Sequence, residues 1–363
     1  MKIGFYHRLL NLINSQKIYV NRRIKLKSKI KYLALGLLLN SIGLLASEAT
    51  NSGPGSTFMV SAEYLFWNVL NSDLYYAYNG TDVNAGGVVS KGEISRLKPT
   101  AHSGVRVGAA INPSWFAING KWTYYHNNST SRTFRSSAPA AELSPVFMNF
   151  SGAPNAGAAI AQYSLNVNMG DLYLTHKFKP APWFFLEPLL GIRGSAFKQN
   201  LDVIYSNVAI AGIGGTNNVD SKNTIDFKGI GLRSGINFGL RGPMGFCLFA
   251  NSAIDLLWTK VDVSETETYL SGGTIAAGTV RNSLKDHYHD ICPVLELEVG
   301  LAWDGCLPLC GLKTNVHVGW EFQNFINYGH YTYFTELSEH TIFYQKTSCI
   351  ALSGLTAGVN FYY

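Results

Sequence analysis

The sequence has no long apolar run after residue 49, and it carries little charge. Beyond that point no stretch approaches the roughly 18 consecutive apolar residues that predict a transmembrane helix. No long stretch shows the hydrophobic period of about 3.6 residues that is typical of an amphipathic helix. Asp, Glu, Lys and Arg make up only 14% of the 363 residues, whereas Gly, Tyr and Phe are abundant. These absences argue against a helical membrane protein and leave the β-strand as the main element.

The first 49 residues form a predicted secretory signal peptide. A basic region precedes the nearly uncharged segment Tyr32–Ala46 and the small residues Ser47 and Ala49, which is the pattern of a cleavable leader. A transmembrane anchor is the alternative, but these 15 apolar-region residues rise only about 22 Å as a helix, short of the ~30 Å hydrocarbon core. We therefore expect cleavage after Ala49 and one domain over residues 50–363. The basic residues of the leader are Lys2, Arg8, Lys17, Arg22, Arg23, Lys25, Lys27, Lys29 and Lys31.

Removal of the leader changes the charge of the protein. The whole chain has 29 basic and 23 acidic residues, and the part after residue 49 keeps 20 and 22 of them, so the formal net charge falls from +6 to −2. The basic character therefore belongs to the leader. Nucleic-acid binding loses its only support in the composition, and we expect no nucleic-acid partner.

After the leader, the dominant hydrophobic period is two residues. In residues 246–258, for example, Phe246, Leu248 and Leu256 share one face and Asn251 and Asp255 the other. Strict alternation of this kind predicts β-strands with one apolar face. In residues 163–169 the pattern changes phase near Gly170. The ten predicted strands are 58–66, 105–111, 116–125, 163–169, 184–194, 230–240, 246–258, 295–303, 316–322 and 354–363.

The connections between these strands decide between a soluble sandwich and a membrane barrel. Short Pro/Gly turns alternate strictly with polar stretches of roughly 25 to 35 residues, as in an outer-membrane barrel with short periplasmic turns and long extracellular loops. Greek-key connections give no reason for such sorting. The predicted fold is therefore all-β: a transmembrane antiparallel up-and-down β-barrel of about ten strands. Its apolar face meets outer-membrane lipid, and its Gly, Asn, Arg and Glu face meets the lumen.

The chain ends on an amphipathic strand, "GLTAGVNFYY", with Phe361 and Tyr363 on its apolar face. A barrel explains this ending, because the last strand must pair with the first and leaves no tail to fray. Tyr363 is expected in the interfacial aromatic girdle. A terminal aromatic residue with alternating apolar positions also resembles the signal that the outer-membrane assembly machinery recognises, so Phe361 and Tyr363 are the candidate assembly signal.

Several segments resemble a known family in their order along the chain. They are "GSTFMVSAEYLFWNV", "LEPLLGIRGSAF", "FKGIGLRSGINFGL", "CLFANSAIDLLW", "LELEVGLAWD" and "HVGWEFQNF". This ordered set is similar to the Legionella-type major outer membrane proteins, which chlamydia-like bacteria also have. The resemblance implies an abundant, surface-exposed, Gram-negative outer-membrane barrel, often described as a porin and sometimes cross-linked by disulfides. It implies no catalytic residue and no cofactor.

Charged residues at mid-height of the predicted barrel point into its lumen. The basic ones line one half of the wall and most acids the other, with Glu187 an exception nearer the periplasm. Opposed charges across water predict a porin constriction that passes small polar solutes and ions. If the charges meet instead, they fill the lumen with buried ion pairs, as in a structural or adhesive surface barrel. The candidate constriction residues are Arg106, Lys121, Arg193, Arg233, Glu63, Asp255, Glu296, Glu298 and Glu321.

The densest ionisable cluster is "DHYHD", Asp286–Asp290. It offers a metal site or an outer-rim protease site as a third and distant hypothesis. A zinc site needs three or four converging ligands, and no further ligands can be identified from the sequence. A polar loop end explains the cluster better, so we expect no metal, no cofactor and no enzymatic activity.

Cysteine is scarce, with five residues in the chain. Export predicts an oxidising compartment, and the "CLPLC" turn suggests a local bond between Cys306 and Cys310 near Cys247. The spacing is poor for zinc. Because the number is odd, one thiol stays free or pairs with another chain, and the family resemblance favours disulfide cross-links in a homo-oligomer. The disulfide candidates are Cys247, Cys292, Cys306, Cys310 and Cys349.

Overall fold

A computed structural model describes residues 57–71, 73–83, 89–113, 115–136, 142–147, 155–210, 213–272, 275–306, 313–337 and 340–363. These residues form β-strands and one 3-10 turn, η2 (Pro243–Gly245). In this part of the chain there is no helix with the length and apolar character needed to span a membrane. The predicted leader lies outside the described residues, so its cleavage after Ala49 stays a prediction.

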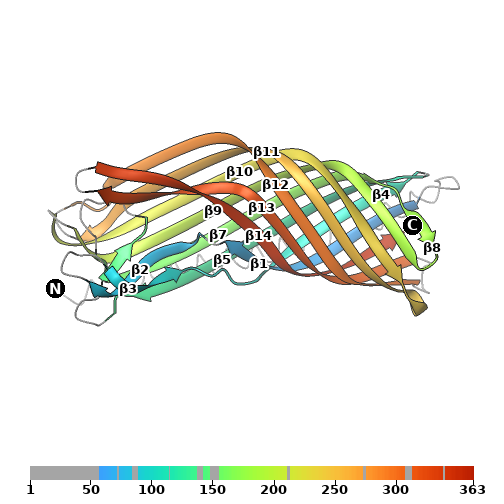
Figure 1. Ribbon diagram of the computed structural model, residues 1–363, viewed down its shortest axis with the longest axis horizontal. Helices are drawn as coiled ribbons and strands as arrows, with labels where there is room; N and C mark the ends of the chain where they lie inside the picture. Colours follow the sequence, from blue (N-terminus) through green and yellow to red (C-terminus); the bar gives the residue numbers. More distant parts are fainter. Residues whose placement is uncertain are drawn as a thin grey trace, which may run out of the picture. The chain divides into compact units, whose positions relative to one another are not determined.

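Ten antiparallel strands close into a barrel, which confirms the predicted fold (Figure 1). Each strand pairs with its neighbours along the chain, β9 pairs with β10, and β1 pairs with both β4 and β14. The short strand β8 (Phe178–Ala181) adds to β9 in a turn. The barrel strands are β1 (Thr57–Asn71), β4 (His102–Asn112), β5 (Ala117–Phe134), β7 (Ala158–Thr175), β9 (Phe184–Ile210), β10 (Ile213–Arg241), β11 (Phe246–Gly272), β12 (Val280–Cys306), β13 (Lys313–Leu337) and β14 (His340–Tyr362).

The two ends of the barrel differ in their connections. At one end, here called the short-turn end, lie β8 and η2. At the other, here called the hairpin end, β9 continues into β10 and β13 into β14 with only two residues between them. Figure 1 shows β8 at the right and β2 and β3 at the left. Since short turns lie on the periplasmic side of outer-membrane barrels, we expect the short-turn end on that side.

The structure corrects the predicted loops. The stretches expected as long loops between the fifth and sixth, seventh and eighth, and ninth and tenth strands are strand over most of their length. As a result β9, β11 and β12 have 27 residues each and β10 has 29. The barrel therefore continues well beyond the strands that the apolar alternation predicts.

An inversion of the hydrophobic alternation explains why these extensions escaped the sequence analysis. On β11, Leu256 and Trp258 face outward and are exposed. Farther toward the hairpin end, Val261 and Val263 are buried inside, while the outward position 260 is a lysine. The first part of the strand faces lipid on its outer side. The second part faces water on its outer side and a packed apolar core on its inner side. We call the outward apolar zone, Phe246–Trp258 on β11 and its equivalents on the other strands, the apolar belt.

The same inversion corrects the predicted fourth strand. The apolar residues Tyr163, Leu165, Val167 and Met169, expected to face lipid, are buried in the barrel interior. The lipid-facing residues of β7 lie beyond Gly170, where Leu172 is 52% exposed. The phase change near Gly170 therefore marks the edge of the apolar belt.

Described parts of the remaining two long connections form a small sheet. It consists of β2 (Tyr75–Val83), β3 (Val89–Arg96) and β6 (Glu142–Pro145), in the order β3-β2-β6. The sheet and its flanks contribute buried Tyr76, Leu143 and Phe147 to the main apolar core. This core lies inside the barrel on the hairpin side. The outward faces of the strands are polar there, so the apolar side chains pack in the interior.

Candidate functional site: an ion-pair layer across the lumen

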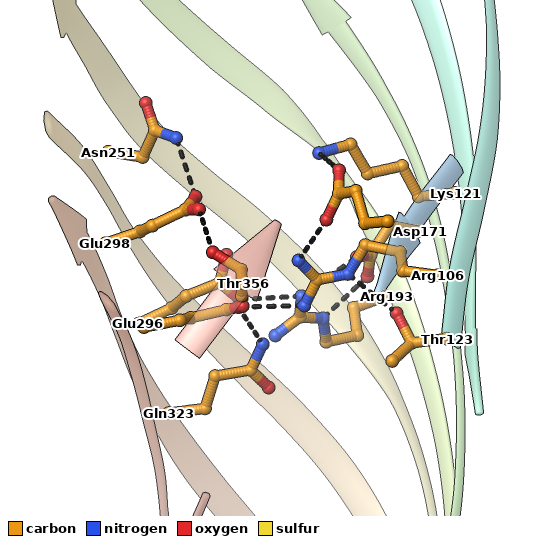
Figure 2. Close-up of polar contacts among 12 residues, drawn as sticks. Arg106, Lys121, Thr123, Asp171, Arg193, Asn251, Glu296, Glu298, Gln323 and Thr356 are labelled. Atoms are coloured by element: carbon orange, nitrogen blue, oxygen red, sulfur yellow. Dashed lines mark hydrogen bonds and ion pairs between the residues drawn. The ribbon is translucent and has the colours of Figure 1, made fainter. Parts of the chain in front are cut away.

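The charged residues predicted for the lumen lie on the inward faces of their strands. Period two places them there, because each alternates with an outward apolar neighbour. Arg106, Arg193 and Arg233 are 6%, 2% and 5% exposed, so the layer is closed to solvent rather than lining a wide channel. Figure 2 shows Arg106, Lys121 and Arg193 on one side of the lumen and Glu296 and Glu298 on the other. We call these residues and the acids that they contact the ion-pair layer.

Arg193 lies at the centre of the layer. Its Nε and Nη2 donate to the two carboxylate oxygens of Asp171 at 2.6 and 2.9 Å. Its Nη1 donates to Asp255 at 2.8 Å, and its Nη2 also reaches Glu296 at 2.8 Å. The guanidinium on β9 thus contacts acids from β7, β11 and β12. This arrangement uses all three nitrogens of a fork that suits planar carboxylates.

Arg233 shares two of these acids. Its Nη1 donates to both oxygens of Asp255 at 3.1 Å, and its Nη2 donates to Glu296 at 2.7 Å. Asp255 and Glu296 therefore each bridge Arg193 and Arg233. Since buried like charges would otherwise repel, the bridging carboxylates are what allow the two arginines to lie together.

A second part of the layer forms around Arg106. Its Nη1 donates to Glu63 at 2.9 Å, its Nη2 to Glu321 at 2.8 Å and its Nε to the Thr123 hydroxyl at 3.0 Å. The guanidinium also lies 5.4 Å from the centroid of the Trp67 ring. Lys121 contacts Glu63 at 3.7 Å. All three guanidinium nitrogens of the buried Arg106 thus have partners.

The three arginines follow one rule. Each has an acid as its direct register partner on a neighbouring strand: Arg106 with Glu63, Arg193 with Asp171, and Arg233 with Asp255. Each also contacts a second acid from a strand farther round the wall, Glu321 or Glu296. The layer is therefore tied both along the wall and across the interior.

Glu298 differs from the other predicted acids. Its carboxylate accepts hydrogen bonds from the amide of Asn251 and the hydroxyl of Thr356, both at 2.9 Å. It is partly exposed toward the short-turn end, together with Asn237, Asn251 and Asn360. The lumen on this side is therefore polar and more open than the ion-pair layer.

Apolar packing covers the other side of the layer. The ring of Phe197 packs at a tilt against Phe227 and edge-on against Phe325, with centroids 5.5 and 4.6 Å apart, and the Phe227 ring lies 5.1 Å from that of Tyr328. The small sheet closes the mouth, where the Tyr205 hydroxyl donates to the carbonyl of Tyr76 at 2.6 Å. Aromatic packing and the ion-pair layer thus fill successive parts of the lumen.

The sequence analysis missed Asp171. It lies on β7 among the strands that carry the basic residues, so the predicted separation of basic and acidic walls has this exception. The phase change near Gly170 was the available signal, because it places residue 171 on the inward face. Thr123 and Gln323, which donates to Glu321 at 2.6 Å, were also not predicted.

The "DHYHD" segment lies within β12 rather than in a loop. His287 contacts Asp262 at 2.7 Å on the outer surface, and Tyr288 stacks on His330 with centroids 4.7 Å apart. His330 also lies 3.1 Å from Asp286. The two contacts with His330 join β12 to β13 beyond Val294 and Phe325, where their backbone pairing stops. Among the described residues no cluster has three ligands suited to a metal ion.

Three of the candidate cysteines are described in full, and none of the three forms a disulfide. Cys247 and Cys292 are buried and Cys349 is exposed. Cys306 ends β12 with its side chain outside the described part, and Cys310 lies outside the described residues. A bond between Cys306 and Cys310 stays a prediction.

The candidate assembly signal lies at the barrel seam. Phe361 in β14 pairs with Val60 of β1 on one side and with Thr314 of β13 on the other. Tyr363 follows the end of β14, and its side chain is 45% exposed. The last strand therefore closes the barrel, as the sequence predicts.

Comparisons with known proteins agree with this architecture. The family described as Legionella pneumophila major outer membrane protein precursor matches residues 51–363. No curated protein matches the chain.

Solved outer-membrane barrels are similar over most of their length. The outer membrane protease OmpT from Escherichia coli has 11% identity and a TM-score of 0.41, over 85% of this chain and 96% of OmpT. The translocator domain of the autotransporter NalP from Neisseria meningitidis has 10% identity and a TM-score of 0.24, over 90% and 95%. A Pseudomonas aeruginosa FadL homologue has 6% identity and a TM-score of 0.23, over 85% and 90%.

Proposed function

Because the chain belongs to the Legionella major outer membrane protein family and forms a closed barrel, we propose that it is a structural surface barrel of the outer membrane with a filled lumen. The passive porin predicted from facing charges becomes the second candidate. We expect the barrel to have no catalytic role.

One observation carries the proposal: Arg193 is 2% exposed and contacts three carboxylates. A water-filled constriction keeps its charges hydrated and apart, so that they act on a passing solute. Here every arginine is paired with carboxylates in a buried layer, as burial requires. Moving a polar solute through this level means separating several ion pairs at once.

The packing beyond the layer adds a second barrier. The ring of Phe197 lies 4.6 Å from that of Phe325, and both side chains are fully buried. The Ser221 hydroxyl donates to the carbonyl of Phe147 at 3.0 Å, which ties the connection after β6 to the barrel wall. A pore would need both this packing and the ion-pair layer to open.

The polar short-turn half supports the second candidate. Asn251, Glu298 and Asn360 face the interior there and are partly exposed. In a porin this half would be a vestibule and the ion-pair layer its gate. The structural barrel and the porin differ in one respect: only in the porin does the ion-pair layer open to let solutes pass.

Single-channel recording in a planar bilayer tests the proposal. We expect no regular conductance steps from the wild-type barrel at low voltage, and none from Lys222→Gln, an exposed control outside the lumen. Steps of uniform size that scale with the amount of wild-type protein would support the porin instead. In that case Arg193→Ala with Arg233→Ala should shift the reversal potential toward cation selectivity without unfolding the barrel.

A further inference from the structure

The outer surface of the barrel has a shallow depression of about 490 Å³ at the hairpin-side edge of the apolar belt. It extends over β5, β7, β9, β10, β11 and β12, and residues from all six strands line it. Trp122 and Trp258 contribute to it together with Lys228, Lys260 and His289. The depression therefore combines aromatic, glycine and basic positions at the boundary between lipid and water.

Its floor lies in one register row across neighbouring strands. Trp122 pairs with Gly170, Gly170 with Gly194, Gly194 with Ile230, and Ile230 with Trp258. The two glycines leave a trough between the exposed side chains of Trp122 and Ile230, and the exposed Trp258 follows Ile230 in the row. A Cβ added to Gly170 would meet nothing within 4 Å. The trough is thus open space on a lipid-facing surface.

The adjoining row toward the hairpin end is basic. Lys228 pairs directly with Lys260, and Lys260 pairs with His289. Their lysine side chains are 63% and 50% exposed. Like charges directly opposite each other on neighbouring strands are unfavourable, so the pair gains stability when an anion lies between them. The ring of His289 lies over Trp258, with centroids 6.2 Å apart.

The acids that contact the two lysines of this row lie on the side away from the belt. Asp226 lies 3.4 Å from Lys228, and Asp262 lies 3.8 Å from Lys260 and 2.7 Å from His287. On the belt side the neighbours in register are Ile230 and Trp258. Flexible lysine side chains can turn toward an anion at the membrane surface while their stems stay on apolar surface.

We propose that this depression binds a phosphate-bearing, acylated lipid of the outer leaflet. The phosphate lies between Lys228, Lys260 and His289, and an acyl chain follows the Gly170–Gly194 trough between Trp122 and Ile230. Basic residues at a membrane surface attract anionic headgroups, and tryptophans favour the same interface. Continuity with the apolar belt selects a lipid over free phosphate, which has no part to fill the trough.

Native mass spectrometry of the detergent-purified barrel with bisphosphorylated lipid A tests the proposal. We expect one retained lipid A in the wild type, and at least a tenfold lower apparent affinity for Lys228→Gln with Lys260→Gln. Lys222→Gln is the matched control, because Lys222 lies on the same strand, 57% exposed and 3.4 Å from its own aspartate, Asp220. Dephosphorylated lipid A should bind the wild type as weakly as lipid A binds the double variant.

The trough is tested separately with Gly170→Leu, which fills open space. Its matched control is Gly120→Leu on β5, where an added Cβ also meets nothing within 4 Å and which lies outside the lining of the depression. We expect only Gly170→Leu to lose lipid A. Equal retention by the wild type and the double lysine variant would overturn the proposal. So would inorganic phosphate that displaces lipid A at millimolar concentration, because the site would then be a free phosphate site.

Discussion

Arg193 and Asp171 form a two-point ion pair between directly opposed positions of β9 and β7. The Nε–Oδ1 distance is 2.6 Å and the Nη2–Oδ2 distance is 2.9 Å. This acid lies among the strands that otherwise carry the basic residues. Arg193 therefore has a carboxylate partner on its neighbouring strand in addition to Asp255 and Glu296, so the lumen is not divided into a purely basic and a purely acidic wall.

The double variant Arg193→Ala with Arg233→Ala should be strongly destabilised. It removes the cations that neutralise Asp255 and Glu296 and leaves both carboxylates in a dry layer. Breaking a buried pair from one side costs about 3–5 kcal/mol. Urea or guanidinium titrations in lipid vesicles, followed by tryptophan fluorescence, measure the loss. A variant as stable as the exposed control Lys222→Ala would show that water already fills this level.

Asp171→Asn should have a smaller effect than the double arginine variant. Arg193 keeps Asp255 and Glu296 as partners, and the asparagine oxygen still accepts one hydrogen bond. We expect a loss of about 1–3 kcal/mol in the free energy of unfolding, the range for removing a charged hydrogen-bond partner. Asp226→Asn, on the outer surface, is the control. Equal stability of the two variants would show that Asp171 does not stabilise the ion-pair layer.

Glu265 should make the barrel less stable as the pH rises. It lies on β11 beyond the apolar belt, 2% exposed, and neither carboxylate oxygen has a partner among the described residues. Burial, together with nearby Glu267, raises the pKa of Glu265 to about 8. The folded state therefore holds this proton more tightly than the unfolded state, whose pKa is about 4.5. The stabilisation is complete below about pH 4.5 and is lost as the pH rises through about 8.

Glu265→Gln removes this titration. We expect the variant to gain stability over the wild type at pH 9 more than at pH 5, in chemical denaturation at each pH. Asp202→Asn on the outer surface controls for changes in net charge. Parallel pH profiles for the wild type and Glu265→Gln would contradict the prediction.

Deletion of Phe361–Tyr363 should stall assembly in the outer membrane. Phe361 pairs with both Val60 and Thr314, so the deletion shortens the strand that closes the barrel. It also removes the candidate assembly signal. The heat-modifiable folded form in outer-membrane fractions is the measurement, with alanine substitution of the exposed Met244 in the η2 turn as a control. Normal amounts of folded barrel after the deletion would refute the prediction.

Non-reducing gels should show disulfide-linked multimers that collapse with reductant. Cys349 is the described thiol that another chain can reach, because Cys247 and Cys292 are buried. Cys349→Ser should therefore reduce the multimers, whereas Cys292→Ser should leave them unchanged. If every species runs as a monomer without reductant, Cys349 is simply a free thiol.

The sequence by itself determined the class of fold, the number of barrel strands and the direction of most side chains. Period two decides direction whenever a strand separates lipid from a lumen, which is why Arg106, Arg193 and Arg233 could be placed inside. The closing role of β14 followed in the same way, because a barrel in lipid leaves no edge unpaired.

Only the tertiary structure decided where the strands end and which charged side chains of the lumen contact one another. Beyond Trp258 the surroundings change from lipid to water while the interior becomes apolar, so the alternation inverts and resembles a polar loop. Whether Arg193 faces water or Asp171, Asp255 and Glu296 depends on register between β7, β9, β11 and β12. Register and barrel closure set distances between residues far apart along the chain, and no local pattern in the sequence records those distances.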